Sequence, residues 1–143
     1  MKWDIYINTV VGKPWVNRST GPDSFDCWGL VVDSLLNVDC IEAPDVDGYI
    51  DNEPIENIGT KAIKSVFWLE SSESDAHIFA CYDNNNNMVH VGRVTPHGAL
   101  HAFGMHGNGQ VSLHTIPTIR RLMILSNPRF KEIKFYRVRD GNV

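Results

Sequence analysis

Cys27 lies where a polar loop gives way to an apolar run. Asp26 is a good N-cap, because its carboxylate can accept the free backbone N–H groups of a helix's first turn. Cys27 would therefore begin a helix, beside the positive end of its dipole, where thiolate is favoured over thiol. A catalytic nucleophile and a buried structural cysteine both fit this position. Apolar side chains follow at the spacing of one helix face, at Trp28, Val31, Val32, Leu35 and Leu36.

Two downstream histidines, His90 and His101, help to decide whether Cys27 is catalytic or structural. A turn at 95–98 (Thr-Pro-His-Gly) joins two segments that alternate like strands. If the first and last residues of this turn pair, His90 and His101 are diagonal neighbours on one face of the hairpin. Gly92, opposite His101, has no side chain to separate the two rings. A register shift of one residue would put His101 on the other face.

Together the three side chains supply a nucleophile, a base and an orienting group. His90 is expected to lower the thiol pKa, take the thiol proton and later give it to the leaving amine. His101 is expected to hold the His90 ring in its useful tautomer. The backbone N–H of Cys27 is the expected oxyanion donor, with Asp26 as a second polar contact. We expect the helix that begins at Cys27 to cover the sheet face that carries both histidines.

Hydrophobic periodicity predicts helices before strands along the chain. This order indicates the α+β class, with N-terminal helices packed on an antiparallel β-sheet and the nucleophile at a helix N-terminus. The length of 143 residues fits a single domain, 1–143. The expected helices cover 3–11, 27 to about 39, and 55–66, and the expected strands cover 76–82, 88–95, 99–104, 121–125 and 133–139.

Composition narrows the possible partners. A formal charge of −4 argues against nucleic-acid binding. The three cysteines Cys27, Cys40 and Cys81 fit no disulfide or metal spacing, and the last two are expected to be small packing residues. The N-terminus lacks the apolar run of a signal peptide, and no segment resembles a membrane span. We therefore expect synthesis in the cytoplasm without a signal peptide, and no membrane insertion.

A zinc site is the alternative use of these side chains. His90 and His101 could bind zinc together with Cys27 or Asp75, but the chain has no close-spaced pair of the Cys-x-x-Cys kind. We therefore expect no metal and no cofactor. Spacing suggests no partner for the other four histidines, which are expected in loops or at the surface: His77, His97, His106 and His114.

Five short blocks, in order, resemble the NlpC/p60 family of papain-like cysteine peptidases. Members carry Gly-x-Pro-Tyr, Phe-Asp-Cys-Ser-Gly-Leu-Val, a Gly-Asp-led strand, His-Val-Gly and a final His-Ala. The corresponding segments here are 12–15 (Gly-Lys-Pro-Trp), 25–31 (Phe-Asp-Cys-Trp-Gly-Leu-Val), 74–82 (led by Ser-Asp), 90–92 (His-Val-Gly) and 101–102 (His-Ala). The resemblance implies a papain-like NlpC/p60 fold with Cys27, His90 and His101 as the catalytic residues.

The resemblance also implies a substrate. Family members hydrolyse peptidoglycan stem peptides, commonly at the D-γ-glutamyl to diamino-acid bond. Their Asp-Cys-Ser segment and tyrosine help to hold the substrate's free amine, so Asp26, Trp15, Trp28 and Gly92 are the expected substrate-binding residues. Here Trp28 replaces the serine and Trp15 the tyrosine, which puts the usual peptide specificity in question.

Asp-Cys-Trp-Gly-Leu and the Phe-Tyr-Arg segment at 135–137 resemble the phage and prophage tail branch of the family. That branch implies tail proteins as partners and delivery by the virion to the host cell wall or periplasm, for wall penetration or tail assembly. Two other functions remain open. One is a non-hydrolytic tail assembly or binding module on the same fold, and the other is an antibacterial peptidoglycan amidase toxin.

Overall fold

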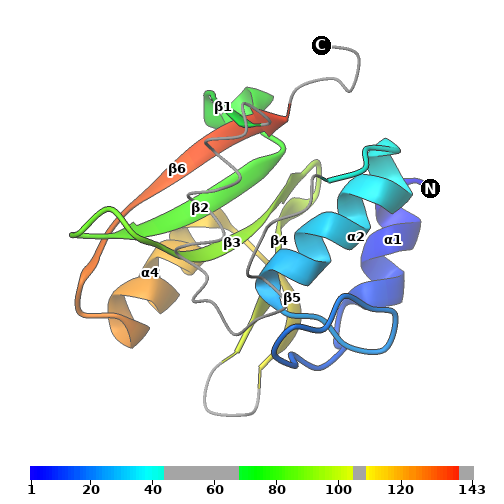
Figure 1. Ribbon diagram of the computed structural model, residues 1–143, viewed down its shortest axis with the longest axis horizontal. Helices are drawn as coiled ribbons and strands as arrows, with labels where there is room; N and C mark the ends of the chain where they lie inside the picture. Colours follow the sequence, from blue (N-terminus) through cyan, green and yellow to red (C-terminus); the bar gives the residue numbers. More distant parts are fainter. Residues whose placement is uncertain (44–67, 105–108, 139–143) are drawn as a thin grey trace.

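A computed structural model describes residues 1–43, 68–104 and 109–138 (Figure 1). The predicted helix at 55–66 lies outside these residues. The helical elements are α1 (Trp3–Val10), α2 (Cys27–Asp39), the short 3-10 helix η1 (Glu73–Asp75) and α4 (Ile116–Ser126). The strands are β1 (Trp68–Glu70), β2 (Ile78–Asp83), β3 (Met88–Thr95), β4 (Gly98–Phe103), β5 (Gln110–His114) and β6 (Phe130–Val138).

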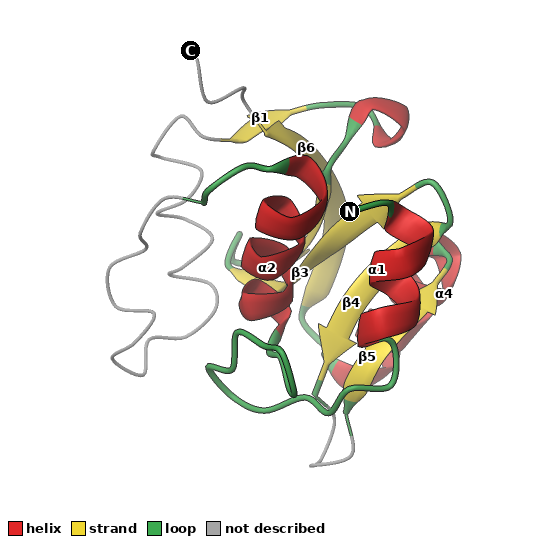
Figure 2. Ribbon diagram, turned by 90° about the vertical axis from the view of Figure 1, so that its right-hand side faces the viewer, coloured by secondary structure: helices red, strands yellow, loops and turns green. Residues whose placement is uncertain are grey.

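The strands form one antiparallel sheet in the order β1-β6-β2-β3-β4-β5. Helices α1 and α2 lie side by side on one face, and α4 lies on the other (Figures 1 and 2). The predicted α+β class, with N-terminal helices packed on an antiparallel sheet, is confirmed. No helix in the described part of the chain has the length and apolar character needed to span a bilayer.

Alternation along β2 divides the core between the two faces of the sheet. Ile78 and Ala80 pack with α2, whereas Phe79 and Cys81 face α4. Full burial of an aliphatic or aromatic side chain of this size contributes about 1.5–3 kcal/mol. The α2 side adds Trp28, Val31, Leu35 and Val91, and the α4 side adds Ala99, Ile119 and Met123.

A buried arginine fixes α2 against β3. Arg93 is 1% exposed, and its guanidinium donates to Asp39 Oδ2 at 2.6 Å, to Ser34 Oγ at 2.8 Å and to the His77 carbonyl at 2.9 Å. A buried charge is tolerated only when its donors are satisfied in this way. The C-terminal half of α2 is therefore tied to the strand that carries His90.

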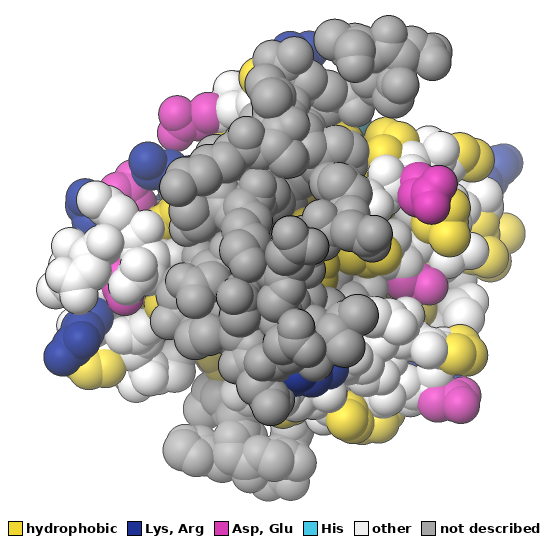
Figure 3. All heavy atoms as spheres, viewed as in Figure 1, with side chains coloured by type: hydrophobic (Ala, Val, Ile, Leu, Met, Phe, Trp, Pro, Cys, Tyr) yellow, Lys and Arg dark blue, Asp and Glu magenta, His cyan; other side chains and the backbone are white. Residues whose placement is uncertain are grey.

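The surface drawn in Figure 3 carries charges of both signs on the side of the β2–β3 turn and β6. Lys131 and Glu132 form an exposed pair there, with 3.4 Å between Nζ and Oε2. Apolar side chains are scattered over the opposite side, where α1 exposes Ile5. Single exposed apolar residues of this kind are normal.

The predicted strand at 121–125 is wrong, because this segment belongs to α4. Thr115 caps that helix by accepting the Thr118 N–H at 3.2 Å, and Pro117 lies in its first turn. Ile119 and Met123, four residues apart, are both buried against the sheet. Capping and helical spacing therefore outweigh the β propensity of the aliphatic run.

Candidate functional site

Cys27 is the first residue of α2, as predicted. Asp26 precedes it and is 6% exposed. One Asp26 carboxylate oxygen accepts the Gly29 N–H at 2.6 Å, and the other accepts the Arg18 N–H at 2.8 Å. The N-cap prediction is confirmed, and the carboxylate also ties the incoming loop to the start of the helix.

The hairpin register is as predicted. Thr95 pairs with Gly98, and the ladder continues to Arg93 and Leu100. Within the described residues, no further β3–β4 pair follows, although β3 stays paired with β2 to Met88 and β4 with β5 to Phe103. The two strands are therefore paired next to the turn and separate further from it, where His90 and His101 lie.

Gly92 occupies the point of separation. A Cβ atom there would lie 2.5 Å from the Phe79 ring and 2.8 Å from the Leu100 carbonyl oxygen. Atoms of a real side chain do not approach this closely, so the position requires glycine. Gly92 thus acts through close packing, and the expected substrate contact remains a prediction.

The sulfur of Cys27 reaches β3 where the strands separate. The backbone N–H groups of Val91, and of Trp28 and Cys27 at the start of the helix, lie close enough to this sulfur to lower its pKa. Figure 1 shows the N-terminal end of α2 in front of the diverging β3 and β4. Val91 directly follows His90, so the thiol lies next to the strand segment that carries the expected base.

A continuous chain of three imidazoles crosses the site. His90 Nε2 and His101 Nδ1 are hydrogen-bonded at 2.9 Å, which confirms that the two rings share a face. His101 Nε2 is hydrogen-bonded in turn to His114 Nδ1 on β5, also at 2.9 Å. His90 and His101 are 4% and 0% exposed, whereas His114 is half-buried. Because His101 occupies Nε2 of His90, the Nδ1 atom of His90 is the one left for the thiol.

The helix expected to cover the histidines lies on the other face of the sheet. His90 is paired directly with Cys81, and its ring packs against Phe79 and Phe103, with centroids 6.0 and 5.0 Å away. These three partners belong to the core under α4. The prediction that α2 covers this face is therefore wrong, and only the N-terminal end of α2 meets the site.

The resting thiol is neutral rather than ionised. Burial and the Asp26 carboxylate raise the pKa of Cys27 to about 12, and the nearby backbone N–H groups only partly oppose this shift. The expected lowering of the thiol pKa is therefore wrong, because burial disfavours the thiolate and Asp26 adds a negative charge at the same helix end.

Both buried histidines are neutral as well. Burial lowers the pKa of His90 to about 3. Burial and the neighbouring imidazoles His90 and His114 lower the pKa of His101 to about 2. A neutral imidazole has a lone pair that can accept a proton, so His90 has the protonation state that a general base needs.

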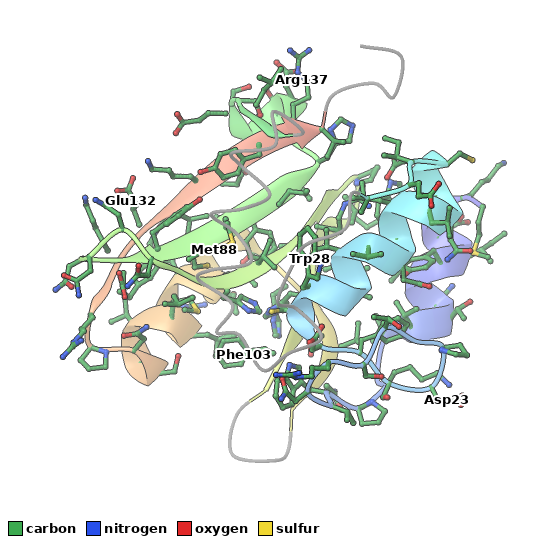
Figure 4. The ribbon with its side chains drawn as sticks, in the orientation of Figure 1. Asp23, Trp28, Met88, Phe103, Glu132 and Arg137 are labelled. Carbon is green, nitrogen blue, oxygen red and sulfur yellow. The ribbon has the colours of Figure 1, made fainter. Side chains whose placement is uncertain are left out.

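The two tryptophans differ in position. Trp28 is 3% exposed and packs in the α2 core with Met88 (Figure 4), and its contact with substrate remains a prediction. Trp15 is half-buried and its ring lies against Gly104. Its backbone N–H donates to the Gly109 carbonyl at 2.9 Å. Trp15 therefore packs at the ends of β4 and β5, and its contact with substrate remains a prediction.

The remaining cysteines and histidines are divided between core and surface. Cys81 is buried as expected, but Cys40 is exposed at the end of α2, so its prediction as a packing residue is wrong. His97 is exposed in its turn, as predicted, and His77 Nδ1 accepts the Val138 N–H at 3.0 Å. His106 lies outside the described residues. Across the described ranges, no three His, Cys, Asp or Glu side chains converge on a common metal position.

Sequence reasoning missed His114 because it did not predict β5. The segment 110–114 (Gln-Val-Ser-Leu-His) alternates apolar and polar residues with the period of a strand. Ser112 pairs with His101, and His114 lies two residues further along the same face. This alternation was the available signal.

No family model and no curated protein sequence matches the chain. Several solved structures are similar to it, and two of them are described here. An N-acetylmuramoyl-L-alanine amidase from Bacteroides uniformis aligns over 92% of this chain and 94% of its own, with a TM-score of 0.50 and 13% identity. The NlpC/p60 domain of the peptidoglycan hydrolase SagA aligns over 91% and 89%, with a TM-score of 0.47 and 15% identity. At 13% identity the likeness to the amidase shows the fold alone, in agreement with the expected arrangement of helices on an antiparallel sheet.

Proposed function

We propose that the chain is a cysteine peptidase that hydrolyses peptidoglycan stem peptides. One observation carries the proposal: the start of α2 brings the thiol of Cys27 to the backbone of Val91, next to His90, and His90 is hydrogen-bonded to His101. In this proposal Cys27 at the start of α2 is the nucleophile, His90 on β3 the base and His101 on β4 the orienting group. The fold shared with a peptidoglycan amidase supports a substrate in the cell wall.

The reaction follows from the neutral resting groups. Nδ1 of His90 takes the Cys27 proton as the sulfur attacks the amide carbonyl carbon, and the resulting oxyanion faces the N–H groups at the start of α2. The proton then passes from His90 to the leaving amine, the C–N bond breaks, and a thioester remains on Cys27. Water, deprotonated by His90, attacks the thioester and releases the acid and the free thiol. His101 holds the His90 ring throughout.

For the bond cleaved, we propose the D-γ-glutamyl to diamino-acid linkage that the five sequence blocks imply. The amide between N-acetylmuramic acid and L-alanine is a second candidate, favoured by the amidase that shares this fold. For the setting, the Asp-Cys-Trp-Gly-Leu segment supports a phage or prophage tail protein that reaches the host wall with the tail. A non-hydrolytic tail module and an antibacterial amidase toxin are the competing functions.

Digestion of purified peptidoglycan followed by mass analysis of the products tests the proposal. The wild-type chain should release fragments cut at a single type of amide bond, and the masses identify that bond. Cys27→Ala should release none, while Cys40→Ser, which changes the exposed cysteine, should match the wild type. Cleavage by Cys27→Ala would overturn the mechanism, and an inactive wild type would favour the binding module.

A further inference from the structure

His114 extends the proposed catalytic pair into a row of three imidazoles. Each ring uses a nitrogen that faces its neighbour, with 2.9 Å from His90 Nε2 to His101 Nδ1 and 2.9 Å from His101 Nε2 to His114 Nδ1. The row begins in the buried core and ends at a half-buried ring on β5. His101, which is fully buried, therefore has both ring nitrogens engaged by other histidines.

The number of protons on these three rings fixes the direction in which each ring donates its hydrogen bond. A neutral imidazole has one N–H and one lone pair, so each ring can donate on one side only. If His90 accepts the thiol proton on Nδ1, its own proton must lie on Nε2 and point to His101 Nδ1. His101 then carries its proton on Nε2 and donates it to Nδ1 of His114. In the opposite direction, the proton on His90 would lie on Nδ1 and block the thiol.

We propose that His114 is a positioning residue for the proposed peptidase reaction, accepting the His101 N–H and thereby keeping Nδ1 of His90 free to act as the base. The inference rests on the proposed function for its catalytic meaning. His114 acts through His101 and His90 and does not itself touch the reacting atoms. Without its acceptor, the Nε2–H of buried His101 would lose its partner, and the opposite tautomer would become competitive.

Two substitutions of His114 distinguish a role as hydrogen-bond acceptor from a role in filling space. His114→Leu fills the space but offers no acceptor. In His114→Asn, an amide oxygen bonded to Cγ occupies nearly the position of Nδ1 and can accept the same hydrogen bond. His97→Asn changes an exposed turn histidine and serves as the control. A residue that merely fills space would be replaced better by leucine than by asparagine, so the order of the two variants is diagnostic.

The readouts are kcat and KM on peptidoglycan fragments, and the side-chain ¹⁵N NMR signals that report imidazole tautomers. We expect His90 and His101 of the wild type to be Nε2–H tautomers. His114→Leu should lower kcat by roughly 10- to 100-fold with little change in KM, and should mix the His101 tautomers. His114→Asn should have a kcat and a His101 tautomer close to those of the wild type. The control His97→Asn should also keep the wild-type kcat and tautomer.

Unchanged kcat and unchanged tautomers in a folded His114→Leu variant would overturn the role of His114. So would full activity in His114→Leu combined with loss in His114→Asn. A wild type that cleaves no peptidoglycan would instead overturn the proposed function. The tautomer signals need no turnover, so in that case they still decide whether His114 fixes the direction of the row.

Discussion

His90 and His101 are hydrogen-bonded at 2.9 Å although the strands that carry them are no longer paired at that point. The last β3–β4 pair is Arg93 with Leu100, and beyond it the strands separate. The separation leaves the N–H of Val91 facing the sulfur of Cys27, while the two rings bridge the strands. The candidate site therefore lies where β3 and β4 separate.

The neutral histidines make stability sensitive to acid. Burial holds the pKa values of His90 and His101 below the ordinary value of about 6.5. Below that pH the unfolded chain binds more protons than the folded chain, so the free energy of unfolding decreases as the pH falls toward about 3. Between pH 7.5 and 5.0, each ring contributes a loss of up to about 2 kcal/mol.

Urea unfolding at these two pH values measures that loss. His101→Gln should show a smaller difference between the two pH values than the wild type, whatever its stability at either one. His97→Gln, at the exposed turn, should keep the wild-type difference. An equal difference in His101→Gln and wild type would show that folding does not lower the pKa of His101.

Gly92 should not tolerate even a methyl group. Alanine there must displace the Phe79 ring, 2.5 Å from the new Cβ, and the Leu100 carbonyl, which belongs to the backbone. Gly92→Ala should therefore lower the free energy of unfolding by about 1–3 kcal/mol, the usual cost of overpacking. It should also reduce hydrolysis, because the displaced groups adjoin both histidines. Wild-type stability in this variant would contradict the close approach of the strands.

Cys27 should react with thiol reagents more slowly than an exposed cysteine at neutral pH. Its pKa is raised to about 12, so little thiolate is present and the labelling rate should increase about tenfold per pH unit above neutrality. Mass spectrometry of labelled peptides should show Cys40 modified first and buried Cys81 last. A Cys27 rate that is constant from pH 5 to 8 would instead indicate a preformed thiolate–imidazolium pair.

The contact of Arg93 with Asp39 should matter more than an exposed ion pair. Asp39→Asn leaves the buried guanidinium with a weaker partner, and we expect a loss of about 1–3 kcal/mol on denaturant unfolding. Glu132→Gln removes the exposed partner of Lys131 and should cost about 0–1 kcal/mol. Equal losses would mean that Arg93 does not anchor α2.

The sequence predicted the parts of the site that local rules determine. The turn at 95–98 set the register of β3 and β4, and with it the meeting of His90 and His101. Asp26 was recognisable as an N-cap, which placed Cys27 at the start of α2. Helical spacing also placed Trp28 in the core, and the structure confirms that position.

Other features depended on contacts that local rules do not contain. His114 lies beyond the segment 104–109, which offers no turn spacing from which its register could be deduced. The separation of β3 from β4 is a tertiary effect, and so is the covering of the histidine face by α4. The raised pKa of Cys27 depends on burial and on Asp26 together, and the helix position alone predicted the opposite direction.

The central claim is that Cys27 is the nucleophile and that its sulfur forms a covalent thioester with the peptidoglycan acyl group. Rapid acid quenching of the reaction with a stem-peptide substrate, followed by mass spectrometry of the protein and its peptides, tests this directly. We predict an acyl adduct on the peptide that contains Cys27, present in the wild type and in Cys40→Ser and absent in Cys27→Ala. Product formation with no adduct on Cys27, or with an adduct on another residue, would contradict it.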